Sequence, residues 1–186
     1  MRIISGNLKG KKISLPINKK TRPLRDLVKE SIFNLLNHSK KIDFDIFDSN
    51  ILDLFSGCGS FGIECISRGA KKITFIENYI DAFKILEKNI SSLNISNKAH
   101  IINQSCFDYF RTRSQPVEKF DLIFLDPPFR EKNINVLLED ILKKDCLTKK
   151  GLIILHRHRK DDVLISKKLQ IIEMRNYGIS KIIFGR

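Results

Sequence analysis

The stretch Asp53-Leu-Phe-Ser-Gly-Cys-Gly-Ser-Phe-Gly62 lies at the end of an apolar run and just before a segment with helical spacing. Its glycines Gly57, Gly59 and Gly62 match the pattern G-x-G-x-x-G, in which glycine lets a ligand approach the backbone between a strand and a helix. Glu77 closes the next apolar run, and an acidic side chain there accepts hydrogen bonds from ribose hydroxyls. The stretch therefore predicts a cofactor that contains a nucleoside, with a plain glycine-rich turn as the alternative.

The carboxylate of Asp53 distinguishes between two such cofactors. A dinucleotide places a doubly anionic pyrophosphate at the helix N-terminus, where a carboxylate four residues before Gly57 is unfavourable. S-adenosylmethionine has no phosphate, and its α-ammonium and sulfonium groups are cationic. Asp53 therefore favours S-adenosylmethionine over NAD, and it can also accept hydrogen bonds from the loop amides.

From residue 50 onward, apolar runs alternate with helical segments, which is typical of a mostly parallel sheet with helices on both faces. The apolar runs are residues 51–55, 73–76, 100–102, 120–125, 152–155, 169–174 and 181–184. Helical spacing covers residues 62–68, 80–93 and 134–143. Only residues 176–180 join the last two runs, which is too short for a crossover helix, so these runs should pair antiparallel. The predicted fold class is α/β, a Rossmann-like and mostly parallel seven-stranded sheet that ends in an antiparallel hairpin.

The apolar run 120–125 ends in Asp126-Pro127-Pro128-Phe129, at the edge of the sheet where open α/β sheets bind ligands. Two prolines fix the backbone and remove two donors, so this loop presents acceptors. The carboxylate of Asp126 and the carbonyl of Pro127 are suited to accept the two hydrogens of an aromatic amine, and Phe129 is suited to stack on its base. A rigid turn with a core aromatic is the structural alternative.

The two motifs together resemble the class I S-adenosylmethionine-dependent amino-methyltransferases, whose sheet typically has seven strands. Three further segments make the resemblance closer, namely Arg2-Ile-Ile-Ser-Gly-Asn-Leu-Lys-Gly-Lys-Lys12, Thr21-Arg22-Pro23 and Val28-Lys-Glu-Ser-Ile-Phe-Asn-Leu-Leu36. These segments are similar to the bacterial RsmD family, whose members methylate the 2-amino group of a guanine in 16S ribosomal RNA. The resemblance covers nearly the whole chain and implies the same fold, cofactor and activity.

The resemblance also implies roles for individual residues. The implied cofactor-binding residues are Asp53, Phe55, Gly57, Gly59, Glu77, Asn78, Ser105 and Cys106. The implied amine-binding and catalytic residues are Asp126, Pro127, Pro128 and Phe129, and the implied substrate-binding residues are Arg22, Pro23 and Glu30. We expect methyl transfer by direct in-line displacement, with Asp126 accepting the proton that the amine sheds.

Three single positions and one short stretch depart from the family pattern. Leu24 stands where threonine is usual, and Lys29 stands where arginine is usual, which keeps the charge but loses bidentate geometry. Ser105 replaces an Asp or Asn that would bind the adenine amino group. After the fifth apolar run, residues 156–159 (His-Arg-His-Arg) replace a more acidic stretch. Additional RNA contacts and a solvated surface run are the two interpretations of that stretch.

Basic residues are concentrated at the two ends of the chain. The whole chain has 34 Lys and Arg against 21 Asp and Glu, a net charge of +13. Residues 1–41 hold 11 basic and 2 acidic side chains, residues 42–150 hold 15 and 16, and residues 151–186 hold 8 and 3. Such ends attract a polyanion, because each neutralised phosphate releases counterions. The side chains expected to bind RNA on this ground are Lys9, Lys11, Lys12 and Arg25. A compositional bias toward lysine is the alternative.

The N-terminal part is expected to be an appendage of the sheet domain. Residues 2–16 contain two short β-like runs around a glycine turn, which suggests a hairpin, and residues 23–37 show helical spacing. We place the boundary at residue 41. This division predicts an RNA-binding part, residues 1–41, and a methyltransferase domain, residues 42–186.

The remaining composition argues against several classes of protein. No apolar run is long enough to span a membrane, and the first 16 residues do not form a signal-peptide core, so we expect a cytoplasmic protein. The four cysteines are far apart and indicate neither a disulfide framework nor a metal site. We expect a monomer that binds no metal and acts on 16S ribosomal RNA within a small-subunit particle.

Three alternative functions share parts of these motifs. A DNA adenine-N6 methyltransferase would use the same Asp-Pro-Pro-Phe loop, because the loop alone does not choose the base. An NAD-dependent oxidoreductase predicts a neutral residue in place of Asp53 and gives that loop no role. A non-catalytic RNA-binding module would keep the basic ends, but it would leave Asp53, Glu77 and Asp126 without a function.

Overall fold

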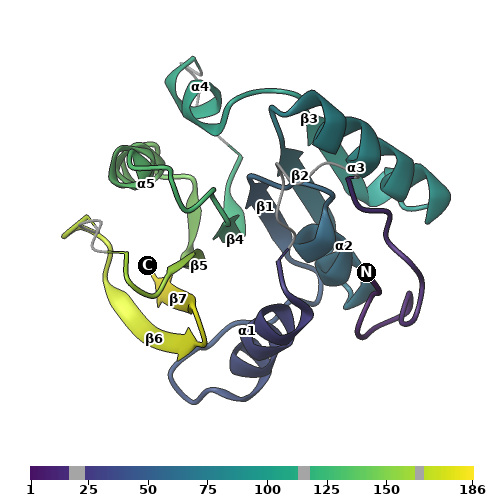
Figure 1. The fold of residues 1–186 in the computed structure, drawn as a ribbon. Helices are drawn as coiled ribbons and strands as arrows, with labels where there is room; N and C mark the ends of the chain where they lie inside the picture. The colour runs from purple at the N-terminus through teal and green to yellow at the C-terminus, as the bar shows by residue number, and fades with distance from the viewer. Residues whose placement is uncertain (17–23, 113–117, 162–165) are drawn as a thin grey trace.

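The computed structural model describes residues 1–16, 24–112, 118–161 and 166–186 (Figure 1). Within these residues, seven strands form one sheet in the order β3-β2-β1-β4-β5-β7-β6. The strands are β1 (Asn50–Leu54), β2 (Lys72–Ile76), β3 (Ala99–Ile102), β4 (Phe120–Leu125), β5 (Leu147–His158), β6 (Ile171–Tyr177) and β7 (Ser180–Gly185). Neighbours from β3 to β5 pair parallel, whereas β7 pairs antiparallel with both β5 and β6. The predicted fold class, a mostly parallel sheet that ends in an antiparallel hairpin, is confirmed.

The helices of the described residues precede the sheet or connect its parallel strands. They are α1 (Asp26–His38), α2 (Ser60–Ser67), α3 (Ile80–Ser92), α4 (Cys106–Arg111) and α5 (Ile134–Lys143), with a 3₁₀ turn η1 (Ser96–Lys98). The sequence did not predict α4, because six residues are too few to show a helical period. In the described part of the chain, no helix has the length and apolar character that crossing a membrane requires.

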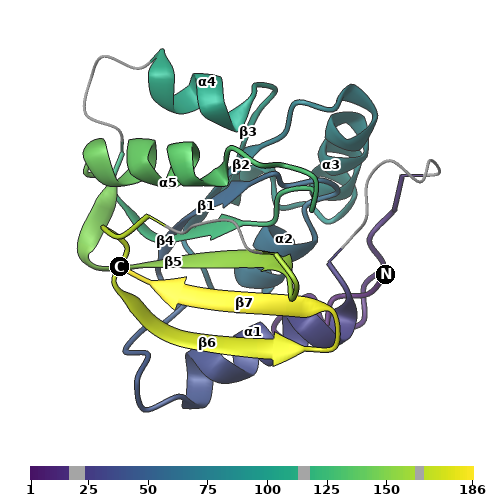
Figure 2. The same ribbon diagram turned by 60° about the vertical axis from the view of Figure 1, so that its left-hand side comes forward.

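Each face of the sheet carries its own hydrophobic core, because alternate strand residues point to opposite faces. In β4, Leu122 and Phe124 pack with side chains of α1, α2 and α3, whereas Ile123 and Leu125 pack with side chains of α4 and α5. Figure 2 shows the same division, with α4 and α5 above the sheet and α1 below it. Since both faces are covered, the central strands are mostly apolar in the sequence.

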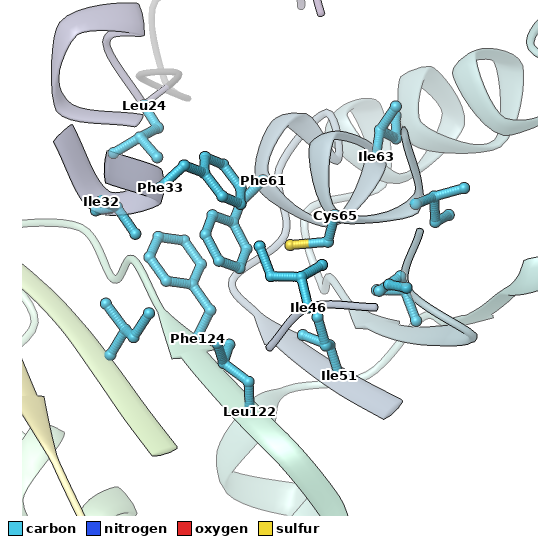
Figure 3. Close-up of a cluster of buried hydrophobic side chains, with 14 of the residues drawn as sticks. Leu24, Ile32, Phe33, Ile46, Ile51, Phe61, Ile63, Cys65, Leu122 and Phe124 are labelled. Atoms are coloured by element: carbon cyan, nitrogen blue, oxygen red, sulfur yellow. The ribbon is translucent and has the colours of Figure 1, made fainter. Parts of the chain in front are cut away.

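A stack of three aromatic rings joins α1 to the sheet. The ring centroid of Phe33 in α1 lies 5.3 Å from that of Phe61 in α2, and the Phe61 ring stacks at 3.8 Å on Phe124 of β4 (Figure 3). All three side chains are buried. The helix α1 therefore packs in the main core, although it lies before the boundary expected at residue 41.

The N-terminal segment (residues 1–16) turns back on itself and makes one antiparallel bridge, between Arg2 and Lys12. The expected hairpin does not extend into a longer ladder, because several of its amides bond to α2 instead. Two of its backbone N–H groups donate to the Glu64 carboxylate at 2.8 and 2.9 Å, and another donates to the Ser67 hydroxyl at 3.0 Å. The segment is therefore fixed along α2.

A buried ion pair also attaches the N-terminal segment and α1 to α2. The Lys29 side chain is 0% exposed, with its Nζ 3.6 Å from Oε2 of Glu64 and 3.5 Å from the carbonyl of Arg2. Glu64 also accepts from Nε of Arg68 at 3.0 Å. Because the hydrophobic core is continuous across residue 41 as well, the expected division at that residue stays a prediction about function.

Candidate active site

The glycine loop (residues 55–59) joins the end of β1 to the start of α2. Gly57 and Gly59 have φ angles of 57° and 83°, in the left-handed region that glycine adopts without strain. A side chain at residue 59 would also collide with Leu86 of α3, whose Cδ1 lies 2.5 Å from the place of the added Cβ. None of the described residues has an atom within 4 Å of a Cβ placed on Gly57, so they leave the backbone there open to a ligand.

Asp53 lies on β1 and bonds to the first turn of α2. Its side chain is buried, and its Oδ2 accepts the N–H of Gly62 at 3.1 Å. Burial raises the pKa of the Asp53 carboxyl well above its usual range; the Gly62 hydrogen bond opposes this rise, and the charges of Asp126 and Glu77 add to it. A cation bound beside Asp53 would relieve this cost. The site therefore fits the α-ammonium of S-adenosylmethionine and disfavours a pyrophosphate.

Glu77 follows β2 and ties the glycine loop to that strand. Its Oε2 accepts the N–H of Gly57 and its Oε1 accepts the N–H of Tyr79, both at 2.7 Å. Burial raises the pKa of the Glu77 carboxyl, and the N–H groups of Tyr79, Gly57 and Asn78 oppose the rise. Each carboxylate oxygen can accept a second hydrogen bond, so Glu77 can hold the loop and still bind ribose hydroxyls.

The proline loop (residues 126–133) leaves β4 beside the glycine loop. Leu125, the last residue of β4, pairs in parallel register with Leu54, the last residue of β1. Asp126 therefore follows β4 next to the start of the glycine loop, which agrees with the effect of its charge on the Asp53 carboxyl. The fold thus brings the two sequence motifs together at the edge where the parallel strands end.

Side chains of β5 and β7 hold the carboxylate of Asp126. Its Oδ1 lies 2.7 Å from Nδ1 of His156, whose Nε2 lies 2.8 Å from Oγ of Ser180. The half-buried ring of Phe129 packs edge-on against His156 and His158, with centroid distances of 5.6 and 5.3 Å. The aromatic of this loop is therefore not a core residue, in contrast to the structural alternative.

The buried side chain of Arg157 fixes the backbone of the proline loop. Its guanidinium donates to three carbonyl oxygens, those of Pro128 (3.3 Å), Phe129 (3.4 Å) and Glu131 (2.9 Å). Its Nε pairs with the Asp161 carboxylate. Among the described residues, no backbone N–H donates to the carbonyl of Pro127. The Pro127 carbonyl, which we expect to accept a hydrogen of the amine, is thus available, while the carbonyls of Pro128 and Phe129 are occupied by Arg157.

The expectation that residues 156–159 follow the fifth strand as a surface run is wrong for His156 and Arg157. Strand β5 continues to His158, and the side chains of His156 and Arg157 are buried. The strand continues because β7 pairs with it antiparallel up to the pair of His158 and Ser180. The sequence signal for this position is that His156 and Arg157 are polar residues at the carboxyl end of β5, the strand next to β4.

Four further residues with an implied cofactor role have different environments. The Oγ of Ser105 accepts the N–H of Phe107 at 3.3 Å and caps α4. Burial raises the pKa of Cys106 to about 12, so its side chain stays a thiol. The Phe55 ring lies edge-on to Phe107 at 6.4 Å, and Asn78 is exposed. Their contact with a cofactor stays a prediction.

Sequence reasoning missed two asparagines near the glycine loop. Asn103 follows β3, and its Nδ2 donates to the carbonyl of Glu77 at 2.9 Å. The buried Asn89 of α3 donates to the carbonyls of Cys58 at 2.9 Å and Ser14 at 3.1 Å, and it accepts the N–H of Ser14 at 2.9 Å. A polar residue on the apolar face of a helix was the signal for Asn89. It links the N-terminal segment directly to the glycine loop.

The side chains expected to contact RNA lie in or near the N-terminal segment. Those that the structure places are all exposed: Lys9, Lys11, Lys12, Arg25 and Glu30. The expected residues Arg22 and Pro23 lie outside the described residues. Among the described residues, the ammonium groups of Lys9, Lys11 and Lys12 form no ion pair.

Comparisons with known proteins agree with this geometry. A curated relative from Haemophilus influenzae, named ribosomal RNA small subunit methyltransferase D, is 33% identical over 181 residues, which cover 96% of this chain and 90% of that protein. A protein of the same name from Buchnera aphidicola is 34% identical over 165 residues, which cover 89% of this chain and 82% of that protein. A solved structure from Escherichia coli, "Putative methyltransferase yhhF", is 25% identical with a TM-score of 0.83 and covers 100% of this chain and 97% of that one.

A family model also spans the whole chain, residues 1–186, and its description is conserved hypothetical protein 95. The family model and the two relatives above each match most or all of the chain. The chain therefore belongs to the conserved hypothetical protein 95 family, which is the RsmD family that its sequence resembles.

Proposed function

We propose that this protein transfers a methyl group from S-adenosylmethionine to the 2-amino group of a guanine in 16S ribosomal RNA. One observation carries the proposal: a glycine loop anchored by two buried carboxylates lies beside a proline loop that offers acceptors. The names of the relatives support ribosomal RNA of the small subunit as the substrate. The guanine and its 2-amino group rest on the resemblance to the RsmD family.

The glycine loop supplies the binding site for the cofactor in this proposal. Asp53 binds the α-ammonium group, and Glu77 binds the ribose hydroxyls with the acceptor positions that its two backbone hydrogen bonds leave free. The open backbone at Gly57 lets the methionine part approach. When bound, S-adenosylmethionine supplies an electrophilic methyl group.

The proline loop positions the target amine. A guanine 2-amino group is a weak nucleophile, because its lone pair is delocalised into the ring. The Asp126 carboxylate and the Pro127 carbonyl each accept one of its hydrogens and thereby localise that lone pair. Asp126 then holds the proton that the amine sheds. Phe129 stacks on the base that carries the amine.

The N-terminal segment captures the RNA in this proposal. Its exposed lysines carry positive charge on a segment that Asn89 attaches to the glycine loop through Ser14 and Cys58. Phosphate contacts of this kind position a nucleic acid without reading its sequence. Replacing Lys9, Lys11 and Lys12 by alanine should therefore weaken RNA binding and lower the slope of log affinity against log salt by about 0.7 to 0.9 for each lost contact.

The control for this experiment removes three lysines from the neutral middle of the chain. Lys84, Lys88 and Lys143 are exposed, and their replacement by alanine removes the same charge. The salt slope and the cofactor affinity should stay unchanged in this control. Equal slopes for the two triple variants would show that the N-terminal lysines bind no phosphates.

Methyl transfer itself is tested with the purified protein and methyl-labelled S-adenosylmethionine. The substrates are naked 16S ribosomal RNA, small-subunit particles and duplex DNA with unmethylated adenine. We expect label in ribosomal RNA only, recovered as N2-methylguanosine after digestion to nucleosides. Label at adenine N6 of DNA, or no transfer by a protein that binds the cofactor, would overturn the proposal in favour of the corresponding alternative.

We further propose that the protein works as a monomer, in the cytoplasm, on an assembled small-subunit particle. The monomer is supported by the site, because residues of one chain fill every role assigned above. The cytoplasm follows from the ribosomal substrate. Methylation that is faster on particles than on naked RNA, by a protein that elutes at the mass of one chain, is the expected result.

A further inference from the structure

A chain of two hydrogen bonds runs across three strands of the sheet, from the start of β7 to the end of β4. Ser180 begins β7, and because β7 is antiparallel to β5, this residue lies beside the end of β5, paired with His158. Ser180 Oγ lies 2.8 Å from Nε2 of His156, and Nδ1 of His156 lies 2.7 Å from Oδ1 of Asp126. The imidazole thus connects the sheet to the carboxylate of the proline loop.

The burial of these groups makes their pairing obligatory. His156 is 6% exposed and Ser180 is 3% exposed, so neither is solvated enough to leave a polar atom without a partner. Both ring nitrogens of His156 have one partner each. The Asp126 side chain is 19% exposed and reaches the surface of the site, where a substrate can meet it.

The partners determine where the hydrogens lie. An ionised carboxylate only accepts hydrogen bonds, so Nδ1 of His156 carries the hydrogen that goes to Asp126. In a neutral imidazole, Nε2 is then the acceptor, and the Ser180 hydroxyl donates to it. This arrangement fixes both the tautomer and the orientation of the ring.

The contact with His156 makes the two carboxylate oxygens of Asp126 different. Oδ1 is held by His156, and the hydrogen bonds found among the described residues leave Oδ2 available. A carboxylate held through one oxygen cannot rotate freely about its terminal bond. Catalytic groups need placement within about 0.5 Å of the productive geometry, and this bond supplies such placement.

We propose that His156 is a positioning residue for methyl transfer, which holds Asp126 through Oδ1 so that Oδ2 accepts a hydrogen of the target amine. Ser180 bonds to Nε2 and fixes the orientation of the His156 ring that this role needs. The inference rests on the proposed function, because it assigns Oδ2 to the amine. A purely structural role, in which the ring only fills space beside Phe129, is the interpretation that the test must separate.

Two amide variants separate the two hydrogen bonds of His156. In His156→Asn the amide nitrogen occupies the region of Nδ1 and can still donate to Asp126, whereas in His156→Gln it occupies the region of Nε2 and reaches Ser180. We expect kcat within about threefold of wild type for the asparagine variant and lowered about 10-fold or more for the glutamine variant. The KM for RNA and the affinity for S-adenosylmethionine should change less than twofold in both, because the contact acts on the reacting amine. A space-filling role predicts the opposite order, since glutamine is the larger side chain.

The matched control is His158→Gln. His158 also packs against the Phe129 ring, with a centroid distance of 5.3 Å, and its Nδ1 accepts the backbone N–H of Lys160 at 3.2 Å. It does not bond to Asp126 in the structure, so its kcat should match that of wild type. A loss of kcat in this control equal to that of His156→Gln would assign both effects to packing of Phe129.

A spectroscopic measurement tests the hydrogen arrangement without any methyl transfer. Imidazole ¹⁵N chemical shifts of the wild type near neutral pH should show His156 with hydrogen on Nδ1, and Asp126→Ala should mix the two tautomers, because it removes the acceptor that holds this hydrogen. Hydrogen on Nε2 in the wild type would overturn the inference, and so would equal kcat values for the asparagine and glutamine variants in an active enzyme. If the wild type methylates no ribosomal RNA, the proposed function fails, and the ¹⁵N shifts still decide whether His156 holds Asp126.

Discussion

The glycine loop and the proline loop lie side by side at one edge of the sheet, but they are held in opposite ways. The glycine loop is held by carboxylates, because Glu77 accepts the N–H of Gly57 and Asp53 accepts the N–H of Gly62 in the helix that follows the loop. The proline loop is a set of acceptors held by donors, because His156 bonds to its carboxylate and Arg157 bonds to its carbonyls.

This difference separates binding from positioning. Carboxylates that face amides leave a buried excess of negative charge, which a cationic ligand offsets when it binds. Donors that occupy most acceptors of a loop leave a small number of acceptors with fixed directions. Changes in the glycine loop should therefore alter cofactor affinity, and changes in the proline loop should alter turnover at constant cofactor affinity.

The largest expected effect comes from Asp126→Ala. We expect turnover to fall by a factor on the order of 10² or more, because the change removes an acceptor used mainly in the transition state. Cofactor affinity should stay nearly unchanged, since the carboxylate belongs to the proline loop. Single-turnover methylation of ribosomal RNA and calorimetric titration with S-adenosylmethionine measure the two quantities. Turnover near that of wild type would remove Asp126 from the reacting centre.

Glu77→Ala tests the other loop. Cofactor binding should weaken by roughly 1 to 3 kcal/mol, the scale of hydrogen bonds to a charged acceptor. The variant also loses two contacts that hold the glycine loop, so its thermal unfolding should be measured in parallel. Glu87→Ala is the matched control, because Glu87 is an exposed carboxylate on α3, and it should leave cofactor affinity unchanged. An equal affinity of the folded Glu77 variant and this control would place the ribose elsewhere.

Asp53→Asn is expected to have a smaller effect on binding and an opposite effect on stability. Asparagine keeps an acceptor for the Gly62 amide, and losing the charge should weaken cofactor binding by about 1 kcal/mol, the difference between a charged and a neutral acceptor. The cofactor-free variant should unfold at higher urea concentration than wild type at neutral pH, because a buried charge has been removed.

The difference in stability between Asp53→Asn and wild type should depend on pH. The pKa of Asp53 is raised in the folded state, chiefly by burial, so the folded protein binds this proton more tightly than the unfolded chain does. Wild-type stability should therefore fall as the pH rises from the ordinary value of 3.8 through the folded-state pKa. The stability gap between variant and wild type should shrink on acidification toward pH 4. Urea unfolding across a pH series measures it, and a gap that widens in acid would contradict the burial argument.

The site is easier to predict from sequence where the contacting residues lie close together in the chain. Asp53 and Gly62 lie nine residues apart, and Glu77 lies 20 residues from Gly57, within one β-α-β unit whose pattern is visible in the sequence. The contacts that hold the proline loop span 26 to 30 residues and depend on where β5 ends. That end is set by pairing with β7, which no local pattern shows.

The N-terminal segment was less predictable for the same reason. Its charge and its turn are local features, and the bridge between Arg2 and Lys12 agrees with the expected turn. Its attachment to Glu64 and Asn89 spans about 60 and 75 residues. Strand alternation and helix periodicity do not specify such polar contacts, because one hydrogen-bonding side chain among apolar neighbours leaves the period unchanged.

The smallest expected loss of turnover is that of Arg157→Lys, which keeps the charge and removes the planar fork. One ammonium group cannot reproduce three carbonyl contacts and the pair with Asp161 in the same geometry, so the backbone of the proline loop should become more mobile. We expect turnover to fall about 3- to 10-fold and cofactor affinity to stay within twofold of wild type. Hydrogen exchange of the loop amides should become faster as kcat falls. The matched control is Arg159→Lys at an exposed residue, which should change neither quantity. If cofactor affinity fell as much as turnover did, the two loops would not be independent, and the separation of binding from positioning would have to be abandoned.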